Sequence, residues 1–271
     1  MLDSLERASG LPIAFDPVTN HIQTPANVSL GAVSERTQSE LAPFLADDTP
    51  ATNEVVYTVY RNIARANDQS AIERAKLRYD ITVIPPGSFR GPRREFFRTA
   101  GHYHAKKPGT AVAYPEVYEV IAGRAYWVIQ KPADDDATIE AVYAIEAGPG
   151  EKAIMLPGFG HVSVNAFSEP LVMANWISNA FEYDYEPFRR LRGAAYWICD
   201  GDGTIAFEPN VNYRAVPNLA KLRPQENPEL GLVRHQPLYT LAARLDALAF
   251  LNTPEGFSAS LTLDRCYRAV L

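Results

Sequence analysis

Cysteine is nearly absent from this sequence, and no long apolar run is present. The two cysteines, Cys199 and Cys266, have no spacing typical of a disulfide framework or a zinc site, so we expect two reduced, largely buried thiols. No segment approaches the roughly 20 apolar residues that a membrane span needs. The N-terminus also lacks the basic start and apolar stretch of a signal peptide. These absences predict a cytoplasmic protein without membrane contacts.

Basic residues are in deficit: 26 Lys and Arg stand against 32 Asp and Glu, which gives a formal net charge of −6. This argues against a general nucleic-acid binder, because such a protein needs a basic face. The sequence has no internal repeat and no low-complexity tract. Apolar residues make up 46% of the 271 residues, enough for one sizeable domain or two small ones with a substantial core.

Short segments rich in β-branched and aromatic residues dominate the middle of the chain. Residues 77–84 alternate, with Leu77, Tyr79, Ile81 and Val83 on one face, and consecutive prolines then end the strand. Further strands are predicted at residues 54–61, 95–99, 116–123, 125–130, 141–148, 153–158, 161–167 and 171–177. Many short strands separated by turn residues are typical of a β-sandwich or barrel.

The two ends of the chain differ from this middle part. Residues 1–50 are rich in Pro, Thr, Asn and Ser, and we expect an N-terminal arm packed on a barrel formed by residues 51–215. Residues 216–271 are predicted to form a linker, best placed at the proline-rich residues 217–228, and a helical C-terminal extension. Apolar residues recur at helical spacing over residues 236–252, which predicts one amphipathic helix packed on the barrel or on a partner subunit.

Three of the five histidines fall into one pattern. His102 and His104 stand two residues apart, so on a strand both imidazoles would point to one side. Glu116 opens the next predicted strand, and His161 opens a later one. Three imidazoles and one carboxylate suit a divalent transition metal, with positions left for water or substrate. The other two histidines lie in loop-like contexts and are interpreted as ordinary surface residues: His21 and His235.

Two sequence blocks around these residues resemble the paired motifs of the cupin superfamily. The first block is His-x-His followed by Glu-x6-Gly, and the second is Pro-x3-His-x3-Asn. The gap of eleven residues between His104 and Glu116 departs from most cupins, where it is three or four. This spacing is closer to one branch of the superfamily, the archaeal-type (cupin-type) glucose-6-phosphate isomerases. That branch is similar over residues 15–185, through the segments VVYTVYR (55–61), TVIPPG (82–87), REFFRTAGHYHAK (94–106), PEVYEVIAGRAYWVIQ (115–130) and LPGFGHVSVNAFSEP (156–170).

The resemblance implies a mainly β fold, a cupin-type double-stranded β-helix (jelly-roll) barrel with an N-terminal arm and a C-terminal helical extension. It implies that one divalent metal ion is bound by His102, His104, Glu116 and His161. It places four residues around the phosphate of a phosphosugar, and a fifth near the sugar: Tyr57, Thr82, Thr99, Gly101 and Tyr118. Without a Cβ, the amide of Gly101 would let a bulky anion approach closely.

The function implied is that of an aldose–ketose isomerase of glycolysis and gluconeogenesis, which interconverts glucose 6-phosphate and fructose 6-phosphate. Our hypothesis is an intramolecular oxidoreductase that works through a metal-stabilised cis-enediolate, with Glu116 as the base and Tyr118 orienting a hydroxyl or relaying a proton. A hydride shift would use the same ligands. Fe(II) is the expected cofactor, although Mn(II), Ni(II) and Zn(II) also suit the ligand set. A homodimer is expected, from the family and from the apolar stripe of the predicted helix.

One segment departs from the family and leaves alternatives open. Residues 176–185 place Tyr183 where the family has a substrate-side histidine, and Ile177 or its neighbour where it has a phosphate-side tyrosine. An isomerase or epimerase of another phosphosugar, a metal-dependent cupin dioxygenase and a non-catalytic sugar-binding cupin therefore remain alternative hypotheses. A basic run beside Thr99 could steer a phosphate inward, although such runs are usually solvated: Arg90, Arg93, Arg94 and Arg98. Asn165 is interpreted as structural.

Overall fold

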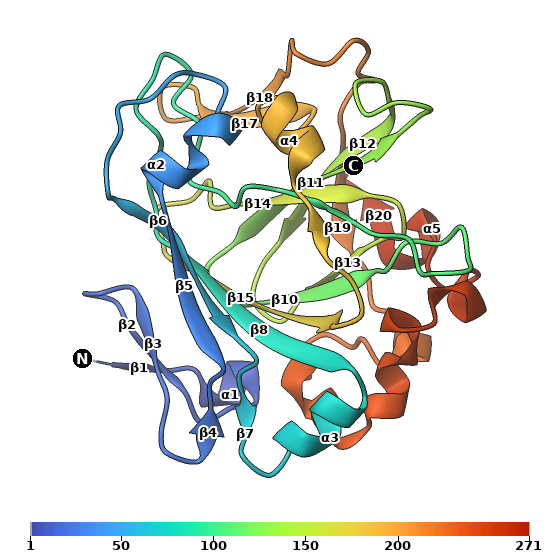
Figure 1. The fold of residues 1–271 in the computed structure, drawn as a ribbon. Coiled ribbons are helices and arrows are strands. Elements are labelled where there is room, and N and C mark those ends of the chain that lie inside the picture. The colour runs from blue at the N-terminus through green and yellow to red at the C-terminus, as the bar shows by residue number, and fades with distance from the viewer. Residues whose placement is uncertain (1, 271) are drawn as a thin grey trace.

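Two β-sheets that face each other form the centre of the molecule in the computed structural model, which describes residues 2–270 (Figure 1). The larger sheet has the strand order β13-β10-β15-β8-β6-β5. Its strands are β5 (Ala32–Thr37), β6 (Val55–Arg61), β8 (Leu77–Ile84), β10 (Glu116–Ala122), β13 (Lys152–Met155) and β15 (Leu171–Ser178). The second sheet has the order β14-β11-β12-β19-β20. Its strands are β11 (Ala125–Pro132), β12 (Ile139–Ala147), β14 (Gly160–Val164), β19 (Ala220–Pro224) and β20 (Tyr267–Ala269).

Smaller elements surround these sheets. The short strands are β1 (Asp3–Ser4), β2 (Ala14–Asp16), β3 (His21–Gln23), β4 (Val28–Ser29), β7 (Ala64–Arg65), β9 (Tyr103–His104), β16 (Tyr183–Asp184), β17 (Tyr196–Asp200) and β18 (Ile205–Pro209). The α-helices are α1 (Glu6–Ser9), α2 (Gln38–Leu41), α3 (Gln69–Arg74), α4 (Glu186–Arg190) and α5 (Leu263–Cys266). The 3-10 helices are η1 (Ala42–Phe44), η2 (Pro228–Leu230), η3 (Leu238–Ala243), η4 (Leu245–Leu251) and η5 (Pro254–Phe257). No helix among residues 2–270 has the length and apolar character needed to cross a membrane.

The prediction of a mainly β, jelly-roll type barrel is confirmed, and the predicted strands correspond to β6, β8, β10, β11, β12, β13, β14 and β15. The predicted strand at residues 95–99 is wrong as a regular element. Glu95, Phe96 and Arg98 form only isolated bridges, to three different parts of the chain. Both cysteines are free and buried, as expected.

The alternation predicted for β8 separates two environments. Tyr79 packs against the rings of Trp176 and Tyr239, at centroid distances of 4.9 and 5.1 Å, and so faces the C-terminal extension. Asp80 and Thr82 point to the other side and line an internal cavity. Strand β8 therefore turns apolar side chains to the outer face of the large sheet, under the extension, and polar side chains to the inner face.

The prediction of one amphipathic helix over residues 236–252 is wrong. Two 3-10 helices, η3 and η4, occupy this segment and are separated at Arg244, whose φ of −145° and ψ of 61° are not helical. The backbone of Leu238 bonds to the barrel instead: its N–H donates to Glu119 (2.6 Å), and its carbonyl accepts from the indole of Trp176 (3.0 Å). Three leucines of the stripe are buried within this chain, Leu238, Leu241 and Leu248, and Leu245 is partly buried against the same core. The stripe therefore gives no support for a dimer.

The linker predicted at residues 217–228 also needs correction. Residues 220–224 form β19, which pairs in parallel with β12 along Tyr143–Ile145. Pro217 precedes this strand and Pro224 ends it, so the prolines of this segment bound a strand and do not mark a free linker.

We expect the buried ion pair of Glu119 and Lys152 to hold the extension on the barrel. Glu119→Gln leaves the Lys152 ammonium, now 2.7 Å from the carboxylate, buried without its counter-charge. The free energy of unfolding should fall by about 3–5 kcal/mol. Urea unfolding measures this free energy. The control Glu140→Gln breaks the exposed pair with Lys131 and should change the free energy of unfolding by less than about 1 kcal/mol. Similar small losses in both variants would contradict this account.

Candidate metal centre

Strand register brings polar residues of four strands together on the inner face of the large sheet. Glu116 and Tyr118 lie two residues apart on β10, so both point inward. Tyr118 pairs with Asn175 of β15, and Asn175 pairs in turn with Asp80 of β8. Arg61 of β6 continues this row, because its neighbour Tyr60 pairs with Ile81. One band of polar side chains therefore crosses the floor of the barrel.

The two sequence blocks meet through backbone pairing. His102 and His161 exchange two backbone hydrogen bonds, with N···O distances of 3.2 and 3.1 Å. His161 lies on β14 and His104 on β9. The Nε2 atoms of His102 and His104 lie 3.1 Å apart, which agrees with the expectation that both imidazoles point to one place.

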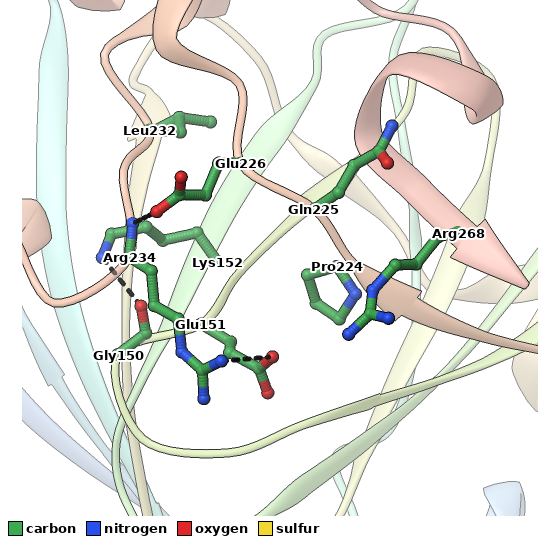
Figure 2. Close-up of a pocket in the computed structure, with 9 residues that line it drawn as sticks. All are labelled: Gly150, Glu151, Lys152, Pro224, Gln225, Glu226, Leu232, Arg234 and Arg268. Carbon is green, nitrogen blue, oxygen red and sulfur yellow. Dashed lines mark hydrogen bonds and ion pairs between the residues drawn. The ribbon is translucent and has the colours of Figure 1, made fainter. Parts of the chain in front are cut away.

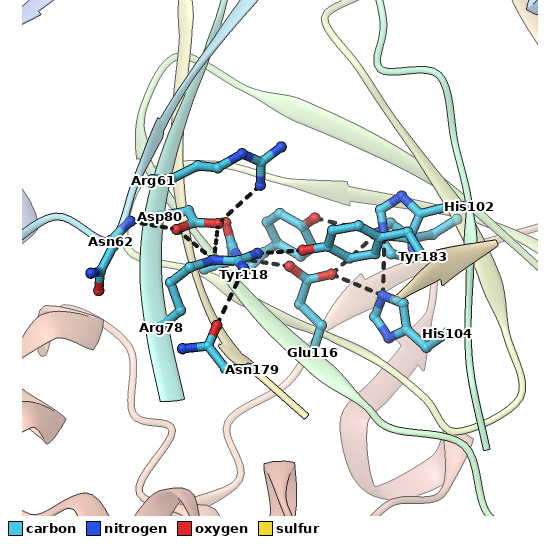
Figure 3. Close-up of polar contacts among 12 residues, drawn as sticks. Arg61, Asn62, Arg78, Asp80, His102, His104, Glu116, Tyr118, Asn179 and Tyr183 are labelled. Carbon is cyan, nitrogen blue, oxygen red and sulfur yellow. Dashed lines mark hydrogen bonds and ion pairs between the residues drawn. The ribbon is translucent and has the colours of Figure 1, made fainter. Parts of the chain in front are cut away.

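Four side chains could hold a metal ion here. One ligand atom from each of His102, His104, Glu116 and His161 lies within 4.8 Å of the others. Glu116 Oε2 is 3.4 Å from the Nε2 atoms of both His104 and His161, and Figure 3 shows part of this cluster. Within the described chain this buried oxygen has no hydrogen-bond partner. An unpartnered carboxylate oxygen facing imidazole nitrogens suits a bound cation.

Neighbouring groups orient two of these side chains. His104 Nδ1 donates to the carbonyl of Tyr114 at 2.8 Å, and because a carbonyl only accepts, this leaves Nε2 free as a ligand. The amide of Asn175 donates to Glu116 Oε1 at 2.7 Å and so turns Oε2 toward the histidines. Such outer contacts fix both the tautomer and the direction of metal ligands.

Burial and charge set the protonation states that a metal requires. Burial lowers the pKa of His102, and the neighbouring His161 and His104 lower it further. Burial also lowers the pKa of His161. Burial raises the pKa of Glu116, but its close approach to His104 and His161 outweighs this effect, so the pKa of Glu116 lies below its usual value. Neutral imidazoles beside an ionised carboxylate are the ligand forms that bind a divalent ion.

A cavity beside the cluster collects the residues predicted to bind the substrate. It is lined by Tyr57, Thr82, Thr99, Gly101 and Tyr118 together with His102 and Glu116. The Tyr118 hydroxyl lies 3.3 Å from His161 Nε2. The structure thus joins the predicted metal ligands and the predicted substrate residues in one site.

Gly101 has a packing reason that the sequence did not reveal. Its φ is +82°, and a Cβ at this position would lie 2.4 Å from Val162 Cγ2 and 2.7 Å from Phe188 Cδ1. Glycine is therefore required here by backbone conformation and close packing, apart from any anion.

Four polar residues of the cavity were missed by sequence reasoning: Arg61, Asp80, Asn175 and Tyr185. Tyr183, which the sequence placed on the substrate side, also lines the cavity. Asp80 carried a usable signal, because it stands two residues before Thr82 on the same strand face. Three arginines of the basic run, which could steer a phosphate but was interpreted as mostly solvated, are engaged outside the cavity. Arg98 is buried against Glu95, Arg93 pairs with Asp47 and Arg94 pairs with Asp200. Asn165 is structural in its contacts, since its amide donates to the carbonyls of Ile84 and Glu169.

Residues 179–185, the last part of the divergent segment 176–185, cover the metal cluster. β16 pairs with β9, so that Tyr183 lies opposite His104, and the Tyr183 ring is 4.3 Å from that of His102. Phe181 stacks on Tyr114 at 4.8 Å. The cavity beneath has a free volume of about 50 Å³, well below the roughly 300–1,000 Å³ of small-molecule sites. Side chains of this segment must therefore move for a sugar to enter.

A larger cavity of about 430 Å³ lies between the barrel and the C-terminal extension (Figure 2). Several of its charged groups are engaged with protein groups. Glu151 lies within 3.9 Å of Arg234, and the Lys152 ammonium, buried against Glu119, also donates to the carbonyl of Gly150. Among residues 2–270, the group of side chains that could hold a metal ion lies at the smaller cavity and not here, so we place the candidate site there.

Two facing sheets with three histidines and one glutamate converging between them define a cupin barrel with a candidate metal centre. The model of the glucose-6-phosphate isomerase (GPI) family matches residues 35–214, and the chain belongs to this family. The glucose-6-phosphate isomerase of Thermococcus kodakarensis is 30% identical over 160 residues, which cover 59% of this chain and 74% of that protein. The enzyme of the same name from Pyrococcus furiosus is 32% identical over 160 residues, with the same coverage.

Among solved structures, oxalate decarboxylase from Bacillus subtilis is similar with a TM-score of 0.32 and 17% sequence identity. The match covers 45% of this chain and 25% of that one. The oxalate decarboxylase of Lactobacillus farciminis gives a TM-score of 0.33 at 18% identity, over 48% of this chain and 30% of that one.

We predict one divalent ion per chain, lost when a ligand is removed. After loading with Mn(II), elemental analysis should give one ion in the wild type and none in His104→Ala. Asn175→Ala should bind the ion about 10- to 100-fold more weakly, because Glu116 loses the group that orients it. The control His235→Ala, at an exposed histidine, should bind like the wild type. Equal binding by wild type and His104→Ala would disprove the ligand set.

The metal-free protein should lose stability as the pH falls. Because His102 and His161 have lowered pKa values when folded, the unfolded chain binds protons first, and the stability present above about pH 6.5 declines below it. Each neutral histidine contributes a slope of up to about 1.4 kcal/mol per pH unit. Glu116, with its lowered pKa, adds loss in the same direction at lower pH. The measurement is urea unfolding in the presence of a chelator at several pH values. The free energy of unfolding of His161→Gln should fall less steeply with falling pH than that of the wild type. Stability that rises between pH 6.5 and 5.5 would refute this.

Proposed function

We propose that this chain is a metal-dependent aldose–ketose isomerase that interconverts glucose 6-phosphate and fructose 6-phosphate. The observation that carries the proposal is the shared cavity, where the candidate metal ligands stand beside Tyr57, Thr82, Thr99 and Gly101. Membership of the isomerase family supports the same reaction. We expect one divalent ion, with Fe(II) first among the candidates.

His102, His104, Glu116 and His161 would hold the ion. When bound, it would supply Lewis-acid stabilisation of the negative charge that develops on the substrate oxygens. An α-hydrogen of an aldose is only weakly acidic, so this stabilisation makes its removal feasible at neutral pH.

Glu116 and Tyr118 are the proposed proton-handling groups. Both point into the cavity from β10, two residues apart. Burial raises the pKa of Tyr118, and the nearby Glu116 carboxylate raises it further, so the phenol keeps its proton at neutral pH. The neutral phenol of Tyr118 can donate a proton to a substrate oxygen, and the ionised carboxylate of Glu116 can accept one.

The phosphate would be bound at Thr82, Thr99, Tyr57 and the backbone of Gly101. Thr99 Oγ1 already accepts from the N–H of Ser163 at 3.0 Å, and its own hydrogen stays available as a donor. Burial raises the pKa of Tyr57 to about 12, so its hydroxyl is also a donor at neutral pH. Three hydroxyls and one amide could thus donate to a phosphate.

A different phosphosugar is a second candidate substrate. This candidate is suggested by residues 179–185, which cover the metal cluster. Within them, Tyr183 receives a hydrogen bond from Arg78 at 2.5 Å and lies against His102. A phenol in this place changes the shape and hydrogen bonding that a bound sugar meets. We also keep a cytoplasmic location and a homodimer as proposals.

The activity test is a coupled assay of fructose 6-phosphate conversion to glucose 6-phosphate. We expect metal-loaded wild type to turn over, and chelated wild type and His104→Ala to be inactive. No turnover by loaded wild type would contradict the proposed reaction. In that case other phosphosugars are assayed next, followed by oxygen uptake.

Tyr118→Phe removes only the hydroxyl that the proposal uses for proton transfer. We expect kcat to fall about 100-fold or more, with metal content unchanged. The control Tyr143→Phe, at a partly buried tyrosine on β12 outside the cavity, should retain the wild-type kcat. Wild-type turnover by Tyr118→Phe would remove this residue from the mechanism.

A further inference from the structure

Arg61 supplies a permanent positive charge to the cavity. Of the described residues that line it, no other is a lysine or arginine. Arg61 ends β6 on the same face as Tyr57 and Val59, which also line the cavity. Its side chain is 31% exposed, and Nη1 lies 3.6 Å from Asp80 Oδ2, too far for a hydrogen bond. Toward the described residues its guanidinium makes no hydrogen bond.

Arg78, on the neighbouring strand, is engaged at every nitrogen. Its Nε donates to both oxygens of Asp80 at 2.9 and 2.8 Å, Nη1 to Asn179 at 3.2 Å and Nη2 to Tyr183 at 2.5 Å (Figure 3). Asp80 also accepts from the N–H of Asn62 at 2.8 Å. Asp80 and Arg78 therefore compensate each other and hold local structure, whereas Arg61 retains both a net positive charge and free donors.

The predicted phosphate subsite lies within reach of Arg61. Thr82 pairs directly with Val59, so Tyr57 and Arg61 are its two diagonal neighbours on β6. Diagonal neighbours on one sheet face stand about 7–8 Å apart, a distance that a long side chain spans. Arg61 can therefore meet an anion that binds at Thr82.

The subsite otherwise offers only neutral donors. A phosphate dianion brought into a buried cavity needs a counter-charge, because hydroxyls and amides alone leave its desolvation poorly compensated. Arg36, near Tyr57, is paired with Glu40 at 3.3 Å, and the arginines between residues 93 and 98 are engaged outside the cavity. Arg61 remains as the cation available to an anionic ligand.

We propose that Arg61 binds the phosphate of the substrate directly. This rests on the proposed function only in that the ligand is a phosphosugar. A guanidinium presents paired N–H groups that match two phosphate oxygens. Arg61 Nη1 lies 3.6 Å from Asp80 Oδ2, and both residues line the cavity. The phosphate would then lie between Arg61 and Thr82, at the β6–β8 side of the floor.

The test measures phosphate binding separately from turnover. Inorganic phosphate is titrated into metal-loaded protein and followed by phosphorus NMR, and fructose 6-phosphate is titrated by calorimetry. Arg61→Gln should weaken both about 10- to 100-fold, the effect of losing a charge-assisted hydrogen bond. The affinities of Arg61→Lys should lie between those of the wild type and Arg61→Gln, because lysine keeps the charge but lacks the paired donors. Arg61→Gln should raise KM for fructose 6-phosphate and leave kcat within about threefold, as expected for uniform binding.

The matched control is Arg234→Gln, which removes the same charge from the larger cavity. The inference is supported if Arg61→Gln weakens phosphate binding and Arg234→Gln leaves it unchanged. This holds even when the wild type fails to isomerise fructose 6-phosphate, because that result contradicts only the proposed reaction. Phosphate binding that is absent in the wild type, unchanged in Arg61→Gln or lost in Arg234→Gln overturns the inference. A lowered kcat with unchanged phosphate affinity overturns it too, since that result marks a merely structural role.

Discussion

The negative charge of Glu116, buried inside the barrel, is the constraint on which the site depends. A carboxylate taken out of water loses several kcal/mol of hydration free energy unless other groups compensate it. Asn175 satisfies one oxygen, and the imidazoles of His104 and His161 face the other at 3.4 Å without a hydrogen bond. The remaining deficit is one that a divalent cation can fill. Metal binding and folding of this region are therefore expected to be coupled.

A second glutamate on the same strand shows how the strand separates structure from chemistry. Glu116 and Glu119 stand three residues apart, so they point to opposite faces of the large sheet. Glu119 binds Lys152 and the backbone of Leu238, and thereby attaches the C-terminal extension to the outer face. The extension covers apolar surface of the barrel, while the inner face is left for polar side chains.

Features that depend on local pattern could be predicted from the sequence. Strand β8 follows from alternation, the other strands follow from short runs of β-branched and aromatic residues between turn residues, and the convergence of His102 and His104 follows from their spacing of two. The row of Arg61, Asp80 and Asn175 was missed because it depends on the register of strands far apart in the chain. The break at Arg244 was missed because buried leucines at helical spacing also fit two 3-10 helices whose backbone bonds to the barrel. The burial of Arg98 against Glu95 was also missed, because it depends on tertiary packing and not on local pattern.

The central claim is that one cavity holds both a metal ion and a phosphosugar. The most direct measurement is paramagnetic relaxation of bound fructose 6-phosphate by Mn(II), read at carbons 1 and 2 and at phosphorus. The account predicts stronger relaxation at the two carbons than at phosphorus, and its loss in His104→Ala. Phosphorus relaxed as strongly as the carbons, or the same relaxation in His104→Ala, would contradict it.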